Sequence, residues 1–160
     1  MGRAMDEIVA RSMAKWPDVP DVYGWLALDR RGNWLLKGEK IANRALRDFI
    51  SRNYQPDARG RWYFQNGPQR VFVKLEYTPL VAHLEARALV DHRGRALGEA
   101  PSAWLDDEGS ILLAADAGAA LLDDRDLARY CDELGSDAES LPRVARAQVA
   151  RQFGFDPDPA

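Results

Sequence analysis

Cysteine is almost missing from this sequence: Cys131 is the single one in 160 residues, which excludes an internal disulfide and a zinc site built from several cysteines. Long apolar runs are missing too, and none approaches the roughly 20 residues needed to span a bilayer. The first sixteen residues carry acids and arginine where a secretory signal would be apolar. At 46% hydrophobic residues the chain can bury a core unaided. We therefore expect a soluble, cytoplasmic protein that does not associate with membranes.

Catalytic motifs are also absent. The two histidines, His83 and His92, are the bases suited to activating a serine or cysteine, and neither lies near a GxSxG nucleophile elbow, which does not occur. The phosphate-binding patterns GxxxxGK[ST] and GxGxxG do not occur either. These absences favour a protein that is not an enzyme and that uses no cofactor.

One acidic cluster is a candidate for catalysis. Asp124 and Asp126 follow an apolar run, and an Asp-x-Asp pair at the end of a parallel strand can bind magnesium and attack phosphate. Here the acids lead directly into a predicted helix, whose first turn favours carboxylates through its free N–H groups and its dipole. The cluster also lacks the central glycine of a calcium loop. We predict no metal site, and a metal-dependent phosphate-ester hydrolase is the least favoured function.

Charge is distributed unevenly along the chain. The net charge of −3 combines −1 over residues 1–22, +7 over residues 23–95 and −9 over residues 96–160. The basic part could attract an anionic partner, or the two parts could neutralise each other within one fold. The overall acidity weighs against nucleic acid as the partner.

Hydrophobic periodicity predicts an α+β fold. Runs of β-prone residues separated by turn residues indicate hairpins over 23–36, 61–90 and 104–122. Apolar positions three and four residues apart predict helices near residues 4–16, 42–53, 124–134 and 141–153. We predict a single domain over residues 1–153, with a mostly antiparallel sheet of hairpins, and a loose tail over residues 154–160.

The pattern Asp-x-x-Gly recurs at predicted turns that begin at Asp29, Asp57, Asp91 and Asp106. The first and last share more context, because DRRGNWLL before the helix NRALRDFI can be aligned with DDEGSILL before the helix DDRDLARY. The alignment suggests a degenerate duplication of a hairpin-plus-helix unit. The alternative is that Asp-x-x-Gly is simply a common hairpin turn, in which Asp starts the turn and Gly supplies the positive φ.

Aromatic side chains and arginines come together in the predicted strands of the basic part. Trp25, Trp34, Trp62 and Arg61 could line a groove, because aromatics beside arginines on a sheet can hold an anionic small molecule. Aromatic residues on strands more often belong to the core, and 9% aromatic residues is no excess. Both interpretations stay open.

A pattern of turns and aromatic strands extends from Asp29 to Ala82. It combines a glycine turn before tryptophan (residues 32–34), a helix, an Asp-x-x-Gly turn with an aromatic strand (57–64) and the segment Tyr-Thr-Pro-Leu-Val-Ala (77–82). On these residues the chain resembles a family of uncharacterised bacterial domains of unknown function. The resemblance implies a duplicated α+β roll and a role in ligand binding or signalling, with no established catalytic residue.

The leading functional hypothesis is a non-enzymatic module that binds a small molecule, anionic in one version, or a protein partner. Its groove is predicted to be lined by Trp25, Trp34, Trp62 and Arg61. The alternative is a protein-interaction or self-assembly subunit, in which the −9 part of one copy meets the +7 part of a neighbouring copy. Self-assembly of this kind predicts a homo-oligomer that dissociates as salt rises, whereas a ligand-binding module stays monodisperse.

Overall fold

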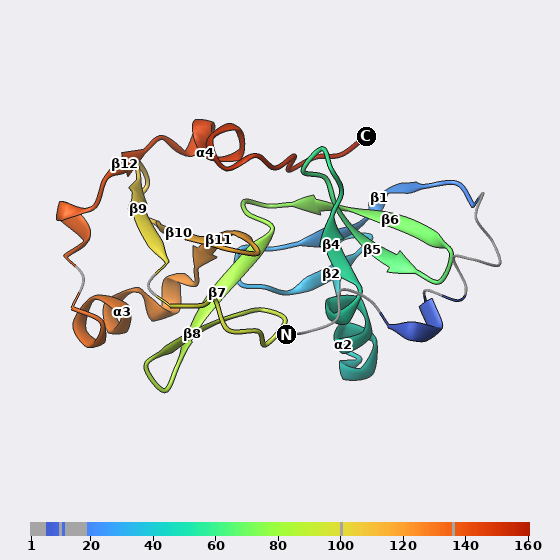
Figure 1. The fold of residues 1–160 in the computed structure, drawn as a ribbon, viewed down its shortest axis with the longest axis horizontal. Helices are drawn as coiled ribbons and strands as arrows, with labels where there is room; N and C mark the ends of the chain where they lie inside the picture. The colour runs from blue at the N-terminus through green and yellow to red at the C-terminus, as the bar shows by residue number, and fades with distance from the viewer. Residues whose placement is uncertain (1–5, 10, 12–18, 100, 136) are drawn as a thin grey trace. The chain divides into compact units, whose positions relative to one another are not determined.

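The computed structural model describes residues 6–9, 11, 19–99, 101–135 and 137–160 (Figure 1). Its contacts divide the chain into two compact units. Unit 1 consists of the described residues up to Asp29, of Asn33–Glu76 and of Phe155–Ala160, and unit 2 consists of Arg30–Gly32 and Tyr77–Gly154. Each unit contains a six-stranded sheet and at least one helix, so the α+β class is confirmed. The single sheet predicted for one domain over residues 1–153 is instead two sheets.

Unit 1 is organised around a sheet with the strand order β3-β2-β1-β6-β5-β4. Its elements are β1 (Val22–Leu28), β2 (Trp34–Leu36), β3 (Glu39–Lys40), α2 (Arg44–Arg52), β4 (Tyr54–Pro56), β5 (Trp62–Asn66) and β6 (Gln69–Leu75). Strands β1 and β6 are parallel, and the other neighbouring strands are antiparallel. Parallel strands need a crossover connection, and helix α2 lies within the connection between β1 and β6.

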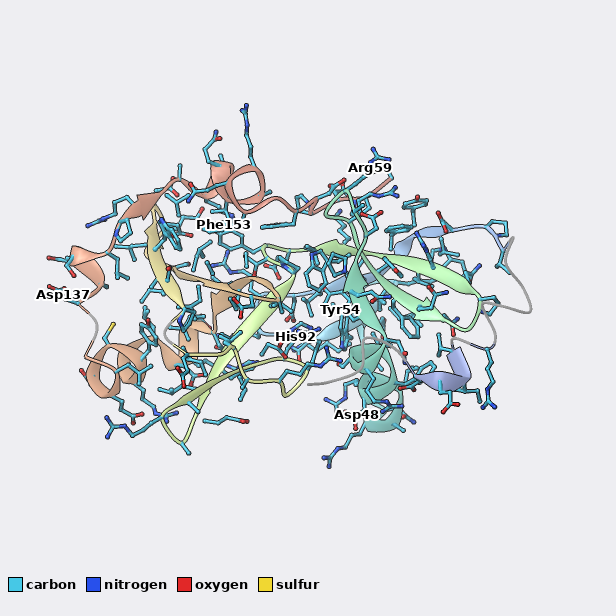
Figure 2. The ribbon with its side chains drawn as sticks, in the orientation of Figure 1. Asp48, Tyr54, Arg59, His92, Asp137 and Phe153 are labelled. Atoms are coloured by element: carbon cyan, nitrogen blue, oxygen red, sulfur yellow. The ribbon has the colours of Figure 1, made fainter. Side chains whose placement is uncertain are left out.

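Aromatic rings fill the core of unit 1. The Tyr54 ring lies edge-on to Trp34, with 4.8 Å between the centroids, and it is tilted against Trp62 at the same distance. Figure 2 shows Tyr54 among the strands. Helix α2 packs on β5 through the ring of Phe49, which lies 5.6 Å from the ring of Phe64. Trp62 and Phe64 reach the same face because side chains alternate along a strand.

Helix α2 is fixed by an asparagine side chain at each end. Asn43 precedes the helix, and its side-chain oxygen accepts a hydrogen bond of 2.9 Å from the backbone N–H of Leu46. Asn53 follows the helix and is fully buried, and its side-chain amide donates to the carbonyl oxygen of Phe49 at 2.9 Å. The helix predicted over residues 42–53 is therefore present, with slightly shorter bounds.

Unit 2 is organised around a sheet with the strand order β12-β9-β10-β11-β7-β8. Its elements are β7 (Leu80–Glu85), β8 (Ala88–Asp91), β9 (Ser102–Asp106), β10 (Ile111–Ala115), β11 (Gly118–Leu122), the short 3-10 helix η1 (Asp124–Asp126), α3 (Leu127–Glu133), η2 (Ala138–Ser140), β12 (Arg143–Val144) and α4 (Arg146–Phe153). The pairs β7–β11 and β9–β12 are parallel, and the remaining pairs are antiparallel. The helix predicted over residues 124–134 is observed as η1 followed by α3.

The last helix begins later than the sequence predicts. Helix α4 starts at Arg146, whereas Arg143–Val144 form β12 and run parallel to β9. The backbone N–H of Leu105 donates to the carbonyl oxygen of Pro142 at 2.9 Å, so the residues around the proline pair with β9 and stay extended. Proline suits the first turn of a helix and also the start of an edge strand, and the pairing with β9 decides between the two.

The two sheets share a connection pattern. The orders β2-β1-β6-β5-β4 and β8-β7-β11-β10-β9 both describe a hairpin and a three-stranded meander whose last strand runs parallel to the first strand of the hairpin. The duplication predicted from sequence is nevertheless not confirmed. Its alignment pairs the β1–β2 turn at Asp29 with the β9–β10 turn at Asp106, and these turns occupy different positions in the two sheets.

The recurring Asp-x-x-Gly pattern has a local cause. In the copies at Asp57, Asp91 and Asp106, the aspartate Oδ1 accepts hydrogen bonds from the backbone N–H groups two and four residues later. The glycine of each copy has a positive φ, and its N–H donates to the carbonyl oxygen of the aspartate. The pattern is therefore a turn held by its own carboxylate, as the alternative interpretation of the sequence states.

The C-terminal tail, predicted to be loose over residues 154–160, is instead packed into unit 1 (Figure 1). Phe155 is 8% exposed. The N–H of Asp156 donates to the carbonyl oxygen of Gly60 at 2.9 Å, and the N–H of Leu75 donates to the carbonyl oxygen of Pro157 at 2.8 Å. The prediction of a loose tail rested on its position at the end of the chain, whereas backbone hydrogen bonds with unit 1 order it.

The first predicted helix, over residues 4–16, lies mostly outside the described residues. Within this range the structure describes residues 6–9 and 11, and residues 7–9 and 11 are helical. Asp6 connects this segment to the end of α2. Its backbone N–H donates to Oδ1 of Asn53 at 2.6 Å, and its carboxylate pairs with Arg52 at 3.2 Å. In the part of the chain that the structure describes, no helix is long and apolar enough to cross a membrane.

Candidate ligand-binding pocket

Unit 1 contains an apolar pocket of about 440 Å³, which we call the unit 1 pocket. Its wall comes from helix α2, from the residue Ile41 before it, and from strands β1, β2, β5 and β6. The lining residues are Val22, Trp25, Leu26, Leu36, Ile41, Leu46, Phe49, Ile50, Phe64, Asn66, Gln69 and Val71. Ten of these twelve are aliphatic or aromatic, so the pocket suits an apolar group.

An irregularity in β1 explains why the pocket is open at Trp25. The pairing of β1 with β6 shifts its register between Val22 and Leu26, which marks a β-bulge. Gly24 lies in this bulge with a φ of 78°, a left-handed value that is unfavourable for residues with a side chain. Neighbouring side chains of a regular strand lie on opposite faces, but beside this bulge Trp25 and Leu26 both line the pocket, Trp25 at 51% and Leu26 at 3% exposure.

The unit 1 pocket has a buried floor and an exposed rim. Leu26 and Ile50 belong to the floor, where both are almost fully buried. Trp25, Leu36 and Leu46 form the rim, and they are 51%, 44% and 40% exposed. Small-molecule sites typically have volumes of about 300–1,000 Å³ and a mostly apolar wall. The unit 1 pocket falls within that range.

Polar groups in the described wall are limited to two amides, Asn66 and Gln69. An amide side chain can both donate and accept hydrogen bonds. Gln69 already donates from Nε2 to the carbonyl oxygen of Pro20 at 3.2 Å. None of the described lining side chains carries an acid or a base, so the wall offers shape and apolar contact rather than proton transfer.

A tight turn beside the pocket places a cation on Trp25. Strands β2 and β3 are joined by Lys37 and Gly38, which have positive φ values of 50° and 84°. The backbone N–H of Lys37 donates to the carbonyl oxygen of Trp25 at 2.7 Å. Its Nζ lies 4.1 Å from the centroid of the Trp25 ring, a distance that fits a cation–π interaction.

Of the three tryptophans predicted to line a groove, one lines the pocket. Trp25 is part of the rim. Trp34 and Trp62 are 2% and 3% exposed in the core of unit 1. The indole N–H of Trp34 donates to Oγ of Ser51 at 3.1 Å, which satisfies its polar atom inside the core.

Arg61, the fourth residue predicted to line the groove, is engaged within its own turn. Its Nε donates to Oδ2 of Asp57 at 2.8 Å, and its guanidinium lies 4.6 Å from the centroid of the Phe72 ring. The hydrogen bond with Asp57 raises the pKa of the Arg61 guanidinium above its ordinary value. Arg61 therefore holds the turn before β5 and does not line the pocket.

The sequence interpretation missed Leu36 and Leu46 as rim residues. Leu46 lies in the helix predicted over residues 42–53, but helical spacing identifies an apolar face without showing what covers that face. The available signal was Gly24, because an isolated glycine inside a strand often marks a bulge or a close approach.

Unit 2 contains a histidine and a carboxylate in contact. Nδ1 of His83 in β7 lies 3.3 Å from Oδ2 of Asp123, which follows β11 and is 1% exposed. Burial by itself raises the pKa of Asp123, but hydrogen bonds from the side chain and backbone of Arg125 outweigh burial and lower the pKa to about 2. The carboxylate therefore stays ionised and fully hydrogen-bonded.

The two aspartates of the hydrolase hypothesis have separate partners. Asp124 pairs with Arg31 at 3.2 Å, whereas Oδ2 of Asp126 accepts a hydrogen bond from the backbone N–H of Leu84 at 3.1 Å. Among the described residues, no group of His, Cys, Asp or Glu side chains is arranged to hold a metal ion. This geometry gives the phosphate-ester hydrolase no support.

Fold and pocket together define an α+β protein with two mixed sheets, one of which forms an apolar pocket with helix α2. A family model matches residues 5–160, and the chain belongs to this family, which is described as a protein of unknown function (DUF2946). The resemblance to an uncharacterised family of unknown function is therefore confirmed.

Two solved structures resemble the chain. A DUF1285 family protein from Silicibacter pomeroyi DSS-3 has a TM-score of 0.55 and 18% sequence identity, over 79% of this chain and 84% of that one. A DUF1285 family protein from Shewanella baltica OS155 has a TM-score of 0.50 and 13% identity, over 68% of this chain and 91% of that one. At these identities the likeness shows the fold alone. No curated protein matches the chain.

Proposed function

We propose that the protein binds a small molecule with an apolar body in the unit 1 pocket and does not transform it. The observation that carries this proposal is the rim, where Trp25, Leu36 and Leu46 stay between 40% and 51% exposed beside a cavity of about 440 Å³. Covering apolar surface is worth about 25 cal/mol per Å², so a ligand that covers the rim gains free energy there. The absence of acids and bases from the described wall supports binding without catalysis.

A ligand-binding module of this kind suits a regulatory or signalling role. A ligand that binds the native state stabilises it by mass action. The pocket wall includes β1, whose pairing with β6 is the central parallel contact of the sheet in unit 1. A ligand in the pocket therefore contacts β1, the strand that pairs with β6 at the centre of this sheet.

The first test uses N-phenyl-1-naphthylamine, an uncharged apolar dye that becomes fluorescent in apolar surroundings. We expect saturable binding with one site per chain. Leu46→Ser removes an apolar rim side chain and should weaken binding about tenfold. Leu134→Ser is the matched control, because Leu134 in unit 2 is 38% exposed and Leu46 is 40% exposed. The control should leave dye binding unchanged.

Two outcomes would overturn this proposal: no saturable binding to the wild-type protein, or an equal loss of binding in the two variants. Thermal unfolding of each variant identifies any loss of fold. If the variants melt at similar temperatures and only Leu46→Ser binds weakly, the unit 1 pocket is the binding site.

Self-assembly through opposite charges receives less support from the structure. Unit 1 contains 12 basic and 11 acidic side chains and unit 2 contains 10 and 14, so their net charges are +1 and −4. The +7 and −9 segments of the sequence do not coincide with the two units, because residues 77–95 belong to unit 2. Sedimentation at low and high salt tests this alternative, and a salt-sensitive oligomer would favour it again.

A further inference from the structure

The residues beside the pocket rim indicate the charge of the ligand. Lys37 and Arg47 directly follow the rim residues Leu36 and Leu46 in the sequence, and both basic side chains are exposed. Of the two, Lys37 directly contacts the rim, because its Nζ lies 4.1 Å from the centroid of the Trp25 ring. A positive charge is thus fixed against the most exposed side chain of the rim.

Lys37 holds this position in spite of an unfavourable backbone conformation. Its φ of 50° lies in the left-handed region, which costs a residue with a side chain roughly 1 kcal/mol. Two-residue turns of this type usually take asparagine, aspartate or glycine instead. Within the described residues the ammonium of Lys37 forms no ion pair with a carboxylate.

One acidic side chain lies near the same turn. Glu39 is opposite Leu36 across the β2–β3 hairpin, and directly opposed side chains point to the same face. Glu39 is exposed, and it makes no ion pair within the described residues. The contact with Trp25 distinguishes the two charges, because the cation and not the acid lies on the rim indole.

We propose that the ligand of the unit 1 pocket is an organic anion, whose apolar body fills the pocket and whose acidic group lies beside the Lys37 ammonium. This inference rests on the proposed function and adds the charge class of the ligand and the residue that recognises it. Trp25 contacts the apolar body, and Lys37 supplies the charge-assisted contact at the mouth. An exposed contact of this kind selects among ligands while the apolar wall supplies most of the affinity.

The experiment compares two dyes that share one apolar body. N-phenyl-1-naphthylamine is uncharged, and 8-anilino-1-naphthalenesulfonate carries a sulfonate on the same ring system. Both are titrated into the wild-type protein, Lys37→Gln, Lys37→Arg and Lys74→Gln. Lys74 is the matched control, because it is an exposed lysine on β6 whose side chain alternates to the face opposite the pocket-lining Val71.

We expect Lys37→Gln to weaken binding of the anionic dye about threefold or more and to change binding of the neutral dye by less than about twofold. Lys37→Arg should restore the anionic dye, and Lys74→Gln should affect neither. Glu39→Gln should leave binding of the anionic dye unchanged or strengthen it. The neutral dye also reports whether Lys37→Gln is still folded, because its binding needs an intact pocket.

The two proposals fail in different ways. If neither dye binds saturably to the wild-type protein, the proposed function is wrong and this inference falls with it. If the neutral dye binds but Lys37→Gln changes the affinities of the two dyes equally, or changes neither, the pocket binds ligands without regard to charge. That result overturns this inference and leaves the proposed function standing.

Discussion

Asp106 shows how a single side chain fixes a turn of unit 2. It is 2% exposed, and its Oδ1 accepts hydrogen bonds from the backbone N–H groups of Glu108 at 2.9 Å and Ser110 at 2.8 Å. Its Oδ2 accepts a hydrogen bond of 2.7 Å from the hydroxyl of Tyr77. Burial, together with this hydrogen bond, raises the pKa of Tyr77 well above its ordinary value. The β9–β10 turn and the Tyr77 ring therefore depend on one buried carboxylate.

Replacing Asp106 by alanine should lower the free energy of unfolding by about 3 kcal/mol, because two backbone N–H groups and the Tyr77 hydroxyl lose their acceptor. Urea denaturation followed by circular dichroism measures the change. Asp116→Ala, at an exposed position between β10 and β11, is the control and should change the free energy by less than about 0.5 kcal/mol. Similar losses in the two variants would contradict the role assigned to Asp106.

The lowered pKa of Asp123 should make stability depend on pH. The pKa of an aspartate carboxyl is about 3.9 in an unfolded chain, whereas the pKa of Asp123 in the folded protein is about 2. Its contribution is therefore complete above about pH 5 and is lost as the pH falls toward 2. We expect the difference in unfolding free energy between wild type and Asp123→Asn to shrink by about 2 kcal/mol over this range. Urea denaturation at several pH values measures it, and a difference that stays constant with pH would refute the assignment.

Strand β1 is the element on which the unit 1 pocket depends. Its bulge at Gly24 lies next to Trp25, and the carbonyl oxygen of Trp25 anchors the turn that carries Lys37. Three of its seven residues, 26–28, pair with β2, and its pairing with β6 extends from Val22 to Leu28 across the bulge. The bulge therefore interrupts the pairing with β6 in the part of β1 that has no partner in β2. A change in the backbone of β1 should therefore act on stability and on ligand binding together.

Gly24→Ala tests this dependence. The φ of 78° at Gly24 is strained for alanine, so the variant should lose about 1 kcal/mol of stability and bind N-phenyl-1-naphthylamine about threefold or more weakly. Gly98→Ala is the matched control, because Gly98 has a φ of 91° in unit 2 and an added Cβ meets nothing within 4 Å at either position. We expect the control to lose similar stability with unchanged dye binding. Equal dye affinities for the two variants would show that the bulge does not shape the pocket.

The sequence predicts most elements and few of their partners. Runs of β-prone residues locate β1, β5, β6, β7 and β10, because the preference of a residue for strand conformation is a local property of the sequence. Pro142 is misassigned because the choice between helix and strand there is made by β9, which lies some forty residues earlier. Local patterns also do not reveal that β1 pairs in parallel with β6. Without the strand pairings, the sequence does not show whether the strands form one sheet or two.

At the scale of the whole molecule, the candidate site could be predicted only in part. Trp25 was identified from its residue type and its basic surroundings, and it lies on the rim. The rest of the wall extends from Val22 to Val71 and is assembled by the parallel pairing of β1 with β6 and by the packing of α2 on β5. A tryptophan on a strand can belong to the core or to a pocket rim, and its residue type does not distinguish the two. The sequence therefore could not show that Trp34 and Trp62 are core residues while Trp25 lies on the rim.

The division into two units predicts the effect of removing the tail. Deleting residues 155–160 removes the buried Phe155 and two backbone hydrogen bonds, so the stability of unit 1 should fall by about 3 kcal/mol. Hydrogen exchange reports this locally. The amide of Leu75 should exchange about 100-fold faster, whereas the amide of Leu112 in unit 2 should change little. Unchanged protection of Leu75 would contradict the packing of the tail in unit 1.

The return of residues 155–160 to unit 1 also sets an order of events during synthesis. The ribosome synthesises most of unit 1 before most of unit 2, but unit 1 also needs residues 155–160. By the time these residues are made, all of unit 2 has been translated. Domains usually become complete in the order in which they are synthesised. Here the unit that starts first is completed last, so a nascent chain carries an unfinished unit 1, with Leu75 lacking its partner, throughout the translation of unit 2.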